Sequence, residues 1–164
     1  MPDTVRRRLL SCLAVVALIA APRTAAAADP VLLTVVDTAT GTRVELTRAR
    51  MDALAQHVIA TTTDFTEGTA EFRGPLATDI LAAAGAGGAR EVKLVAANDY
   101  SVTVPADDFR AYGVVMATEM NGKRLSLRDR GPVWVMYPLD DFPELRRPHY
   151  IDRLIWQLVR VEAR

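Results

Sequence analysis

Few side chains in this sequence have the type and spacing that catalysis requires. The two histidines, His57 and His149, lie far apart in the sequence, and no pattern places them together. Ser101 and Ser126 have neither a nearby histidine nor the glycine-flanked turn that presents a hydrolase nucleophile. The sequence therefore gives no support to a hydrolase triad, and we assign no catalytic residue.

Acidic residues gather at two places. Asp107 and Asp108 could form a paired-carboxylate acid/base unit, but adjacent side chains point apart and both acids suit the first turn of a helix. The segment 139–150 could hold a hard cation through Asp140, Asp141, Glu144 and His149. That segment lacks the regular spacing of a calcium loop, which favours a solvated surface loop and predicts no metal ligand.

Aromatic residues and arginines give the best candidate for a binding site. Tyr100, Trp134, Tyr137 and Trp156 lie in apolar segments, where core packing is the default interpretation. The other hypothesis is a pocket lined by some of these rings, with Arg73 and Arg130 at its mouth. Such a pocket would bind a small anionic or heteroaromatic ligand. Its predicted binding residues are Arg73, Tyr100, Arg130 and Trp134.

The first 28 residues have the pattern of a secretory signal. A basic segment precedes an apolar run and a small-residue site, which predicts cleavage before Asp29 and a periplasmic or secreted protein. The segment 6–10 also fits the core of a twin-arginine signal, although an ordinary signal is the favoured interpretation. The only cysteine, Cys12, lies in this leader, so residues 29–164 have no thiol for a disulfide, a metal or a nucleophile.

The remaining chain, residues 29–164, has the length of one domain and no second apolar run that could cross a membrane. The whole sequence has 20 basic and 20 acidic residues, and the leader holds four arginines and one aspartate. The domain is therefore acidic by about three charges. This balance argues against a nucleic-acid partner, because nucleic-acid-binding domains usually present a basic face.

Short β-type segments dominate the domain. The expected strands are 31–36, 42–46, 57–62, 91–97, 100–105, 114–120, 123–127, 133–137 and 153–162, with a short extended piece at 70–72. Helices are expected at 48–56, capped by Thr47, and at 75–84, with Pro75 in the first turn and Gly85 after the end. A short helix or turn is expected at 105–112.

Two turns predict hairpins, at Asn98-Asp99 and at Asn121-Gly122. Asn-Gly is the stronger signal, because both of its residues tolerate a positive φ. The alternation of the last strand shifts near Leu158, which indicates a bulge or burial on both faces. Strands and helices in mixed order predict an α+β fold, with a mixed, mainly antiparallel sheet and short helices.

Several of these segments together resemble the molybdopterin-binding domain of the sulfite oxidase family. The matching residues are Asp99-Tyr100 with Pro105, Ala117, Glu119-Met120-Asn121-Gly122, Gly131-Pro132-Val133, Trp156, and the Gly74-Pro75-Leu76 step. The similarity covers roughly residues 72–161. The resemblance implies the α+β fold of that family and makes molybdopterin the cofactor to consider.

The resemblance also implies that parts of an active enzyme are absent. In that family a cysteine thiolate ligates molybdenum, and residues 29–164 contain no cysteine. Arg130 stands where the family usually has a histidine, and Trp134 where it has an arginine. Residues 139–141 replace a glycine-containing loop, and the N-terminal half of the enzyme domain has no counterpart. The chain thus resembles a truncated relative of the family.

Three hypotheses follow. The first is an exported, non-catalytic module that binds a small ligand or a partner, such as a membrane signalling or redox protein, without a bound cofactor. The alternative is an active molybdopterin-dependent oxidoreductase that holds its cofactor without a cysteine ligand. The third is an interaction module whose 139–150 loop docks onto a membrane receptor.

Overall fold

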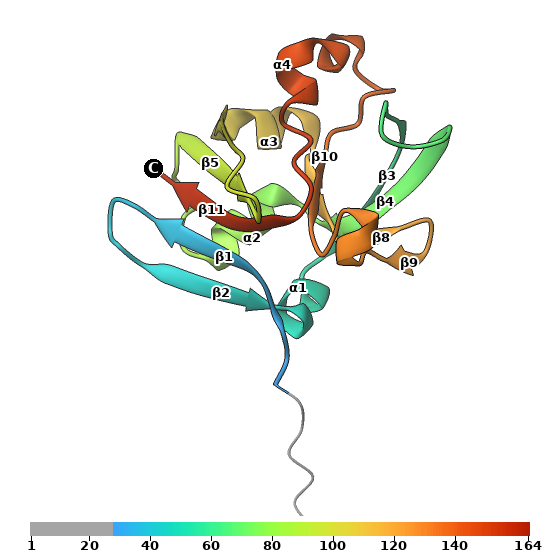
Figure 1. Ribbon diagram of the computed structural model, residues 1–164. Helices are drawn as coiled ribbons and strands as arrows, with labels where there is room; N and C mark the ends of the chain where they lie inside the picture. Colours follow the sequence, from blue (N-terminus) through green and yellow to red (C-terminus); the bar gives the residue numbers. More distant parts are fainter. Residues whose placement is uncertain (1–27) are drawn as a thin grey trace, which may run out of the picture.

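A computed structural model of the protein describes residues 28–164 (Figure 1). Cys12 and all but the last residue of the predicted signal lie outside the described residues. Within the described part, no helix is long and apolar enough to cross a membrane.

The largest sheet joins the beginning and the end of the described chain. Its strand order is β2-β1-β11-β5-β6. Its members are β1 (Val31–Asp37), β2 (Arg43–Thr47), β5 (Glu91–Ala96), β6 (Ser101–Pro105) and β11 (Leu158–Ala163). The pair β1 and β11 is parallel, and every other neighbouring pair is antiparallel. The C-terminal strand therefore lies in the middle of the sheet (Figure 1).

Two smaller sheets complete the β structure. One has the order β3-β4-β8-β9, from β3 (Gln56–Thr62), β4 (Thr69–Pro75), β8 (Glu119–Met120) and β9 (Lys123–Arg124). The other pairs β7 (Val115–Ala117) with β10 (Trp134–Met136). All of these pairs are antiparallel. The mixed, mainly antiparallel α+β class that the sequence predicts is confirmed.

The helices are short. They are α1 (Arg48–Ala53), α2 (Ala77–Ala83), α3 (Ala106–Tyr112) and α4 (Pro148–Ile151), with 3-10 helices η1 (Leu127–Asp129) and η2 (Pro143–Arg146). The predicted cap Thr47 is confirmed, since its hydroxyl accepts a hydrogen bond from the Arg50 amide at 3.4 Å. Gly85 follows α2 with a φ of 75°, a conformation that ends a helix and suits glycine.

The core lies between the sheets. Its largest fully buried side chains include Trp134 and Tyr137 of the β10 region, Phe72 of β4 and Phe109 of α3. The rings of Phe72 and Trp134 meet edge to face, with 5.3 Å between their centroids. This contact joins the four-stranded sheet to the β7–β10 pair.

Both predicted hairpins form. Strands β5 and β6 pair across the Asn98-Asp99 turn, and β8 and β9 pair across Asn121-Gly122. The predicted irregularity of the last strand is also confirmed, because the register of β11 on β5 shifts between Leu158 and Arg160.

The prediction of one strand over 114–120 is wrong. The segment divides at Thr118 into β7 and β8, which belong to different sheets. The Thr118 amide donates to the carbonyl of Arg73, and its carbonyl accepts from the amide of Leu125, each at 2.9 Å. Thr118 makes these bonds at the point where the chain passes from one sheet into the other.

Other predicted boundaries were also wrong. Pro75 ends β4 and pairs with Gln56, so α2 begins only after the cap residue Leu76. The first helix stops at Ala53 because Gln56 begins β3, and the extended piece predicted at 70–72 is the full strand β4.

The two predictions near the C-terminus need similar correction. Residues 153–157 are not a strand, because the turns of α4 continue to Leu154, whose amide donates to the carbonyl of Ile151. The predicted surface loop 139–150 contains η2 and most of α4, and it buries Leu139 and Leu145 in the core.

Candidate ligand-binding site

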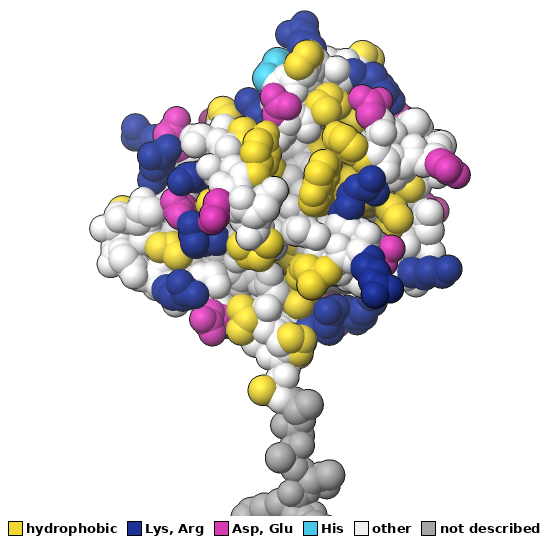
Figure 2. Space-filling model, in the orientation of Figure 1, with side chains coloured by type: hydrophobic (Ala, Val, Ile, Leu, Met, Phe, Trp, Pro, Cys, Tyr) yellow, Lys and Arg dark blue, Asp and Glu magenta, His cyan; other side chains and the backbone are white. Residues whose placement is uncertain are grey.

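A pocket of about 280 Å³ opens where three separate segments meet. The segments are the β3–β4 loop, the turn between β5 and β6, and residues 151–156 between α4 and β11. The lining residues are Phe65, Ala96, Asn98, Tyr100, Ile151, Asp152, Leu154, Ile155 and Trp156. Hydrophobic side chains gather over the upper half of the face shown in Figure 2, around a hollow.

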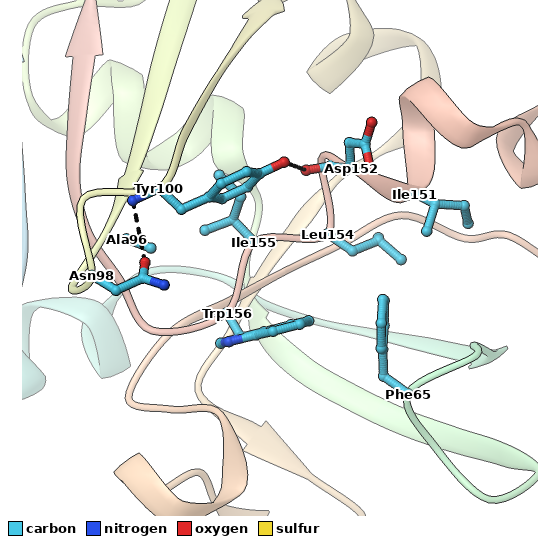
Figure 3. A pocket seen from close by; sticks show the side chains of 9 residues that line it. All are labelled: Phe65, Ala96, Asn98, Tyr100, Ile151, Asp152, Leu154, Ile155 and Trp156. Carbon is cyan, nitrogen blue, oxygen red and sulfur yellow. Dashed lines mark hydrogen bonds between the residues drawn. The ribbon is translucent and has the colours of Figure 1, made fainter.

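Two aromatic rings border the pocket on opposite sides. Tyr100 and Trp156 lie above and below the hollow in Figure 3, with Ile155 and Leu154 between them at the back. Tyr100 is 48% exposed and Trp156 is 38% exposed. Large aromatic side chains are usually much more buried than these two. Two such exposed rings beside one pocket therefore indicate a binding surface for an apolar or planar group.

Trp156 is held in place by its neighbours. Phe65 meets it edge to face, with 5.1 Å between ring centroids, and Trp134 meets it in the same way at 6.4 Å. The buried Trp134 is itself fixed, because its indole nitrogen donates to the Leu154 carbonyl at 3.1 Å. The ring of Trp156 therefore rests on a rigid aromatic support.

Arg130 adds a cation to this aromatic support. Its guanidinium carbon lies 5.3 Å from the ring centroid of Trp134 and 5.7 Å from that of Trp156. These distances are within the range of cation–π attraction. Arg130 is not part of the pocket lining, so it reaches the pocket only through Trp156.

Unusual backbone conformations surround the pocket. Asp99, Arg130 and Gln157 adopt positive φ angles of 65°, 66° and 52°, which residues other than glycine rarely adopt. The amide of Ala97 donates to the carbonyl of Gln157, and the amide of Gln157 donates to the carbonyl of Arg130, both at 2.9 Å. Strained residues of this kind persist where the surrounding structure fixes them, and they cluster at functional sites.

The polar groups of the lining are few. The Tyr100 hydroxyl donates to the backbone carbonyl of Asp152 at 3.3 Å, which closes one side of the pocket (Figure 3). The Asn98 side-chain oxygen accepts from the Tyr100 amide at 3.2 Å. Asp152 is the one charged residue in the lining, and no lysine or arginine belongs to it.

Three of the four predicted binding residues lie together. Tyr100 lines the pocket, and Trp134 and Arg130 support Trp156 from outside it. Arg73 does not join them. It lies in β4, where its guanidinium pairs with Glu119 of β8 at 3.1 Å.

Sequence reasoning missed Phe65 and Asn98 as pocket residues. Phe65 lies in a polar, glycine-containing loop. An isolated aromatic residue in such a loop is the one sequence signal that could have indicated a binding residue there. The Asn98-Asp99 pattern predicts only a turn, and in the structure that turn places Asn98 in the pocket lining.

The residues present do not match a thiolate-held metal. The only cysteine lies outside the described residues, and within them no group of three or more histidine, cysteine or acidic side chains could hold a metal ion. In the 139–150 segment, the Asp140 carboxylate has partners other than a metal. It accepts from the Thr62 amide at 2.9 Å and pairs with Arg146.

Comparisons with known proteins agree on the relationship. The family model described as oxidoreductase molybdopterin binding domain matches residues 42–140. Among solved structures, the sulfane dehydrogenase SoxCD from Paracoccus pantotrophus is similar, with a TM-score of 0.60 and 12% identity. That match covers 82% of this chain but only 38% of the SoxCD chain. No curated protein matches the sequence. The fold and the matched length together show that this chain belongs to the oxidoreductase molybdopterin-binding domain family.

Proposed function

We propose that this protein is a non-catalytic member of its family that binds a small planar heteroaromatic ligand between Tyr100 and Trp156. The observation that carries the proposal is the pair of half-exposed rings on opposite sides of one pocket. A planar ring inserted between them would contact aromatic surface on both of its faces. Each such contact contributes about 0.5–1.5 kcal/mol beyond the burial of area.

The shape of the pocket supports a small ligand. Its volume of about 280 Å³ is just below the range of roughly 300–1,000 Å³ that is typical of pockets for drug-sized ligands. The packing of Phe65 and Trp134 against Trp156 keeps one wall in place before binding. A preformed wall reduces the entropy that the complex must lose, and so favours affinity.

The charges around the pocket favour a neutral ligand over an anionic one. Asp152 brings a carboxylate to the lining, and its negative charge would repel a ligand acid. Arg130 lies outside the lining, with its guanidinium over two indole rings. We therefore propose a heteroaromatic ring whose donor groups hydrogen-bond to acceptors on the rim.

A binding experiment tests this proposal. The panel contains pterin, pterin-6-carboxylate, lumichrome and adenine, and the readouts are tryptophan fluorescence and titration calorimetry. We expect saturable binding of at least one neutral ring, weaker binding of the carboxylate, and loss of binding in Trp156→Ala and Tyr100→Ala. Leu127→Ala is the matched control, because Leu127 is exposed and lies outside the pocket. Failure of every ring to bind would reject the proposal.

A second experiment separates binding from the redox alternative. The family binds molybdopterin, but the residues that the structure describes include no cysteine to ligate molybdenum. We expect protein purified from a host that makes molybdopterin to contain far less than one molybdenum per chain. The measurements are metal analysis and the fluorescence of the oxidised pterin. One molybdenum per chain would restore the oxidoreductase alternative.

We also propose that the domain works outside the cytoplasm, beside a membrane signalling or redox protein. The support is the signal-like pattern of the first 28 residues. A reporter enzyme that is active only after export, fused behind residue 164, should be active with the leader and inactive without it.

Deletion of 139–150 is unsuitable as a test of docking, because that segment buries Leu139 and Leu145. Substitution of the exposed Arg147 tests partner binding without opening the core.

A further inference from the structure

One short segment supplies most of the pocket. Residues 151–156 contribute Ile151, Asp152, Leu154, Ile155 and Trp156 to the lining. Arg153 is the one member of the segment that does not line the pocket. The shape of the pocket therefore depends on how this segment is held against the rest of the domain.

The second half of the segment is fixed by backbone bonds to the core. The carbonyl of Leu154 accepts from the buried indole of Trp134 at 3.1 Å. The carbonyl of Ile155 accepts from the amide of Val135 at 2.8 Å. Both partners are buried, so these two bonds are protected from competition with water.

The first half has much weaker backbone support. The amides of Asp152 and Arg153 donate only to α4, to the carbonyls of Pro148 and Tyr150, each at 3.0 Å. The carbonyl of Asp152 accepts from the Tyr100 hydroxyl at 3.3 Å, which is a long bond on a half-exposed side chain. Side chains must therefore provide most of what fixes Ile151 and Asp152.

Arg153 provides that attachment. Its guanidinium forms an ion pair with Asp108 of α3, and the two side chains are only 14% and 16% exposed. The same guanidinium lies over the ring of Tyr150, 4.6 Å from the centroid. The hydroxyl of Tyr150 lies 3.3 Å from that of Tyr112, at the end of α3. Two contacts thus join α4 and the segment after it to α3.

We propose that Arg153 and Asp108 are positioning residues that hold the Ile151–Asp152 wall and thereby set the affinity of the pocket. The inference rests on the proposed function, because it assigns a means of control to the same site. Neither side chain contacts the ligand space. Loss of the ion pair would let the first half of the segment move, while the bonds of Leu154 and Ile155 keep the second half in place.

The neighbouring acid gives a matched control. Asp107 also lies in the first turn of α3, but its side chain is 91% exposed and it pairs with Arg110 on the same helix. Asp107→Asn and Asp108→Asn therefore make the same chemical change one residue apart. Only Asp108→Asn removes the charge that holds Arg153.

The test compares Asp108→Asn, Arg153→Met, Arg153→Lys and Asp107→Asn with the wild type. The first readout is the affinity for pterin. The second is acrylamide quenching of tryptophan in the free protein, where the buried Trp134 gives a constant background and Trp156 reports the pocket. We expect Asp108→Asn and Arg153→Met to weaken pterin binding about tenfold and to alter quenching, because each variant leaves a largely buried charge unpaired and removes the attachment of the pocket wall.

Arg153→Lys keeps the charge and should retain affinity to within about threefold, and Asp107→Asn should behave as the wild type. Wild-type affinity and quenching in both Asp108→Asn and Arg153→Met would overturn the proposal. If Arg153→Met fails to fold, the near-isosteric Asp108→Asn decides. If pterin does not bind the wild type, the affinity is measured with whichever neutral ring of the panel binds. If no ring binds, the proposed ligand class fails, but the quenching of the free variants still tests the attachment.

Discussion

The guanidinium of Arg130 lies over the indole ring of Trp156, with 5.7 Å between the guanidinium carbon and the ring centroid. It also covers Trp134 at 5.3 Å, so one cation spans both tryptophans of the chain. Because Trp134 is buried and Trp156 is partly exposed, Arg130 links the core to the wall of the pocket. This relationship gives the first of four predictions.

Arg130→Ala should loosen the exposed indole. The substitution removes both cation–π contacts, so we expect faster acrylamide quenching of Trp156 and a loss of about 1 kcal/mol of stability. Arg128→Ala is the control, because Arg128 is exposed in the adjacent 3-10 helix. Identical quenching curves for the wild type and Arg130→Ala would show that the contact does not restrain Trp156.

Gly74 should tolerate no side chain. A Cβ atom built there would lie 2.2 Å from the carbonyl oxygen of Met116, which belongs to the buried strand β7. Gly74→Ala must separate β4 from β7, so we expect at least about 3 kcal/mol of destabilisation or failure to fold. Gly88→Ala, where no atom lies within 4 Å of the new Cβ, should stay near the wild type in urea unfolding. Wild-type stability of Gly74→Ala would contradict the close approach of these strands.

The pair of Asp52 and Arg124 should stabilise the fold only above acid pH. The two terminal guanidinium nitrogens of Arg124 donate to the two carboxylate oxygens of Asp52, at 3.0 and 2.7 Å. This hydrogen bonding lowers the pKa of Asp52 below 3.8. A lowered pKa means stability that is present above the unfolded value and is lost as the pH falls through the folded value. Asp52→Asn should therefore lower the melting temperature modestly at pH 7, since both side chains are partly exposed.

The difference between Asp52→Asn and the wild type should shrink as the pH falls below 3.8. Thermal melts at pH 7, 5, 4 and 3 measure this trend. A difference that is constant over this whole range would mean that the carboxylate charge does not contribute to stability.

Two tyrosines should resist ionisation in the folded protein. The hydrogen bond to Tyr150 raises the pKa of Tyr112 to about 12, with burial adding to the effect. Burial also raises the pKa of Tyr137, whose hydroxyl is buried. A raised pKa contributes stability that is complete below the unfolded value of 10 and is lost as the pH rises through the folded value.

Absorbance titration of the phenolate band measures this resistance. At pH 11 we expect Tyr112 and Tyr137 to remain protonated and to ionise only when the protein unfolds. Tyr137→Phe should reduce the change in phenolate absorbance that accompanies unfolding. It should leave the change in absorbance before unfolding as it is in the wild type. Ionisation of all four tyrosines before unfolding would contradict the burial of Tyr137.

Local turn chemistry made much of the fold predictable. Asn121-Gly122 identifies its hairpin and Thr47 its helix cap because each signal acts within a few residues of itself. The division of 114–120 was not predictable in this way. Both halves favour strands. At the break, Thr118 bonds to Leu125 just beyond the Asn121-Gly122 turn and to Arg73, which is distant in the sequence.

The site was predictable in part for the same reason. Aromatic content pointed to Tyr100 and Trp134, and the position beside Gly131-Pro132 pointed to Arg130. The path of residues 151–156 decides which rings face the pocket and which rings support it. No local sequence pattern describes that path. Arg73 lies outside this pocket and pairs with Glu119, and that pairing depends on the contact between β4 and β8, which no local pattern predicts.

The most direct measurement of the central claim is a proton–nitrogen correlation spectrum of the labelled protein during titration with pterin. The two tryptophans give two indole signals, which report the pocket wall and its buried support separately. The account predicts a large, saturable shift of the Trp156 signal and a much smaller change at Trp134, whose indole nitrogen is bonded to Leu154. Saturable binding that leaves the Trp156 signal unmoved would contradict the account. So would the absence of any change in either signal with pterin and with every other ring of the panel.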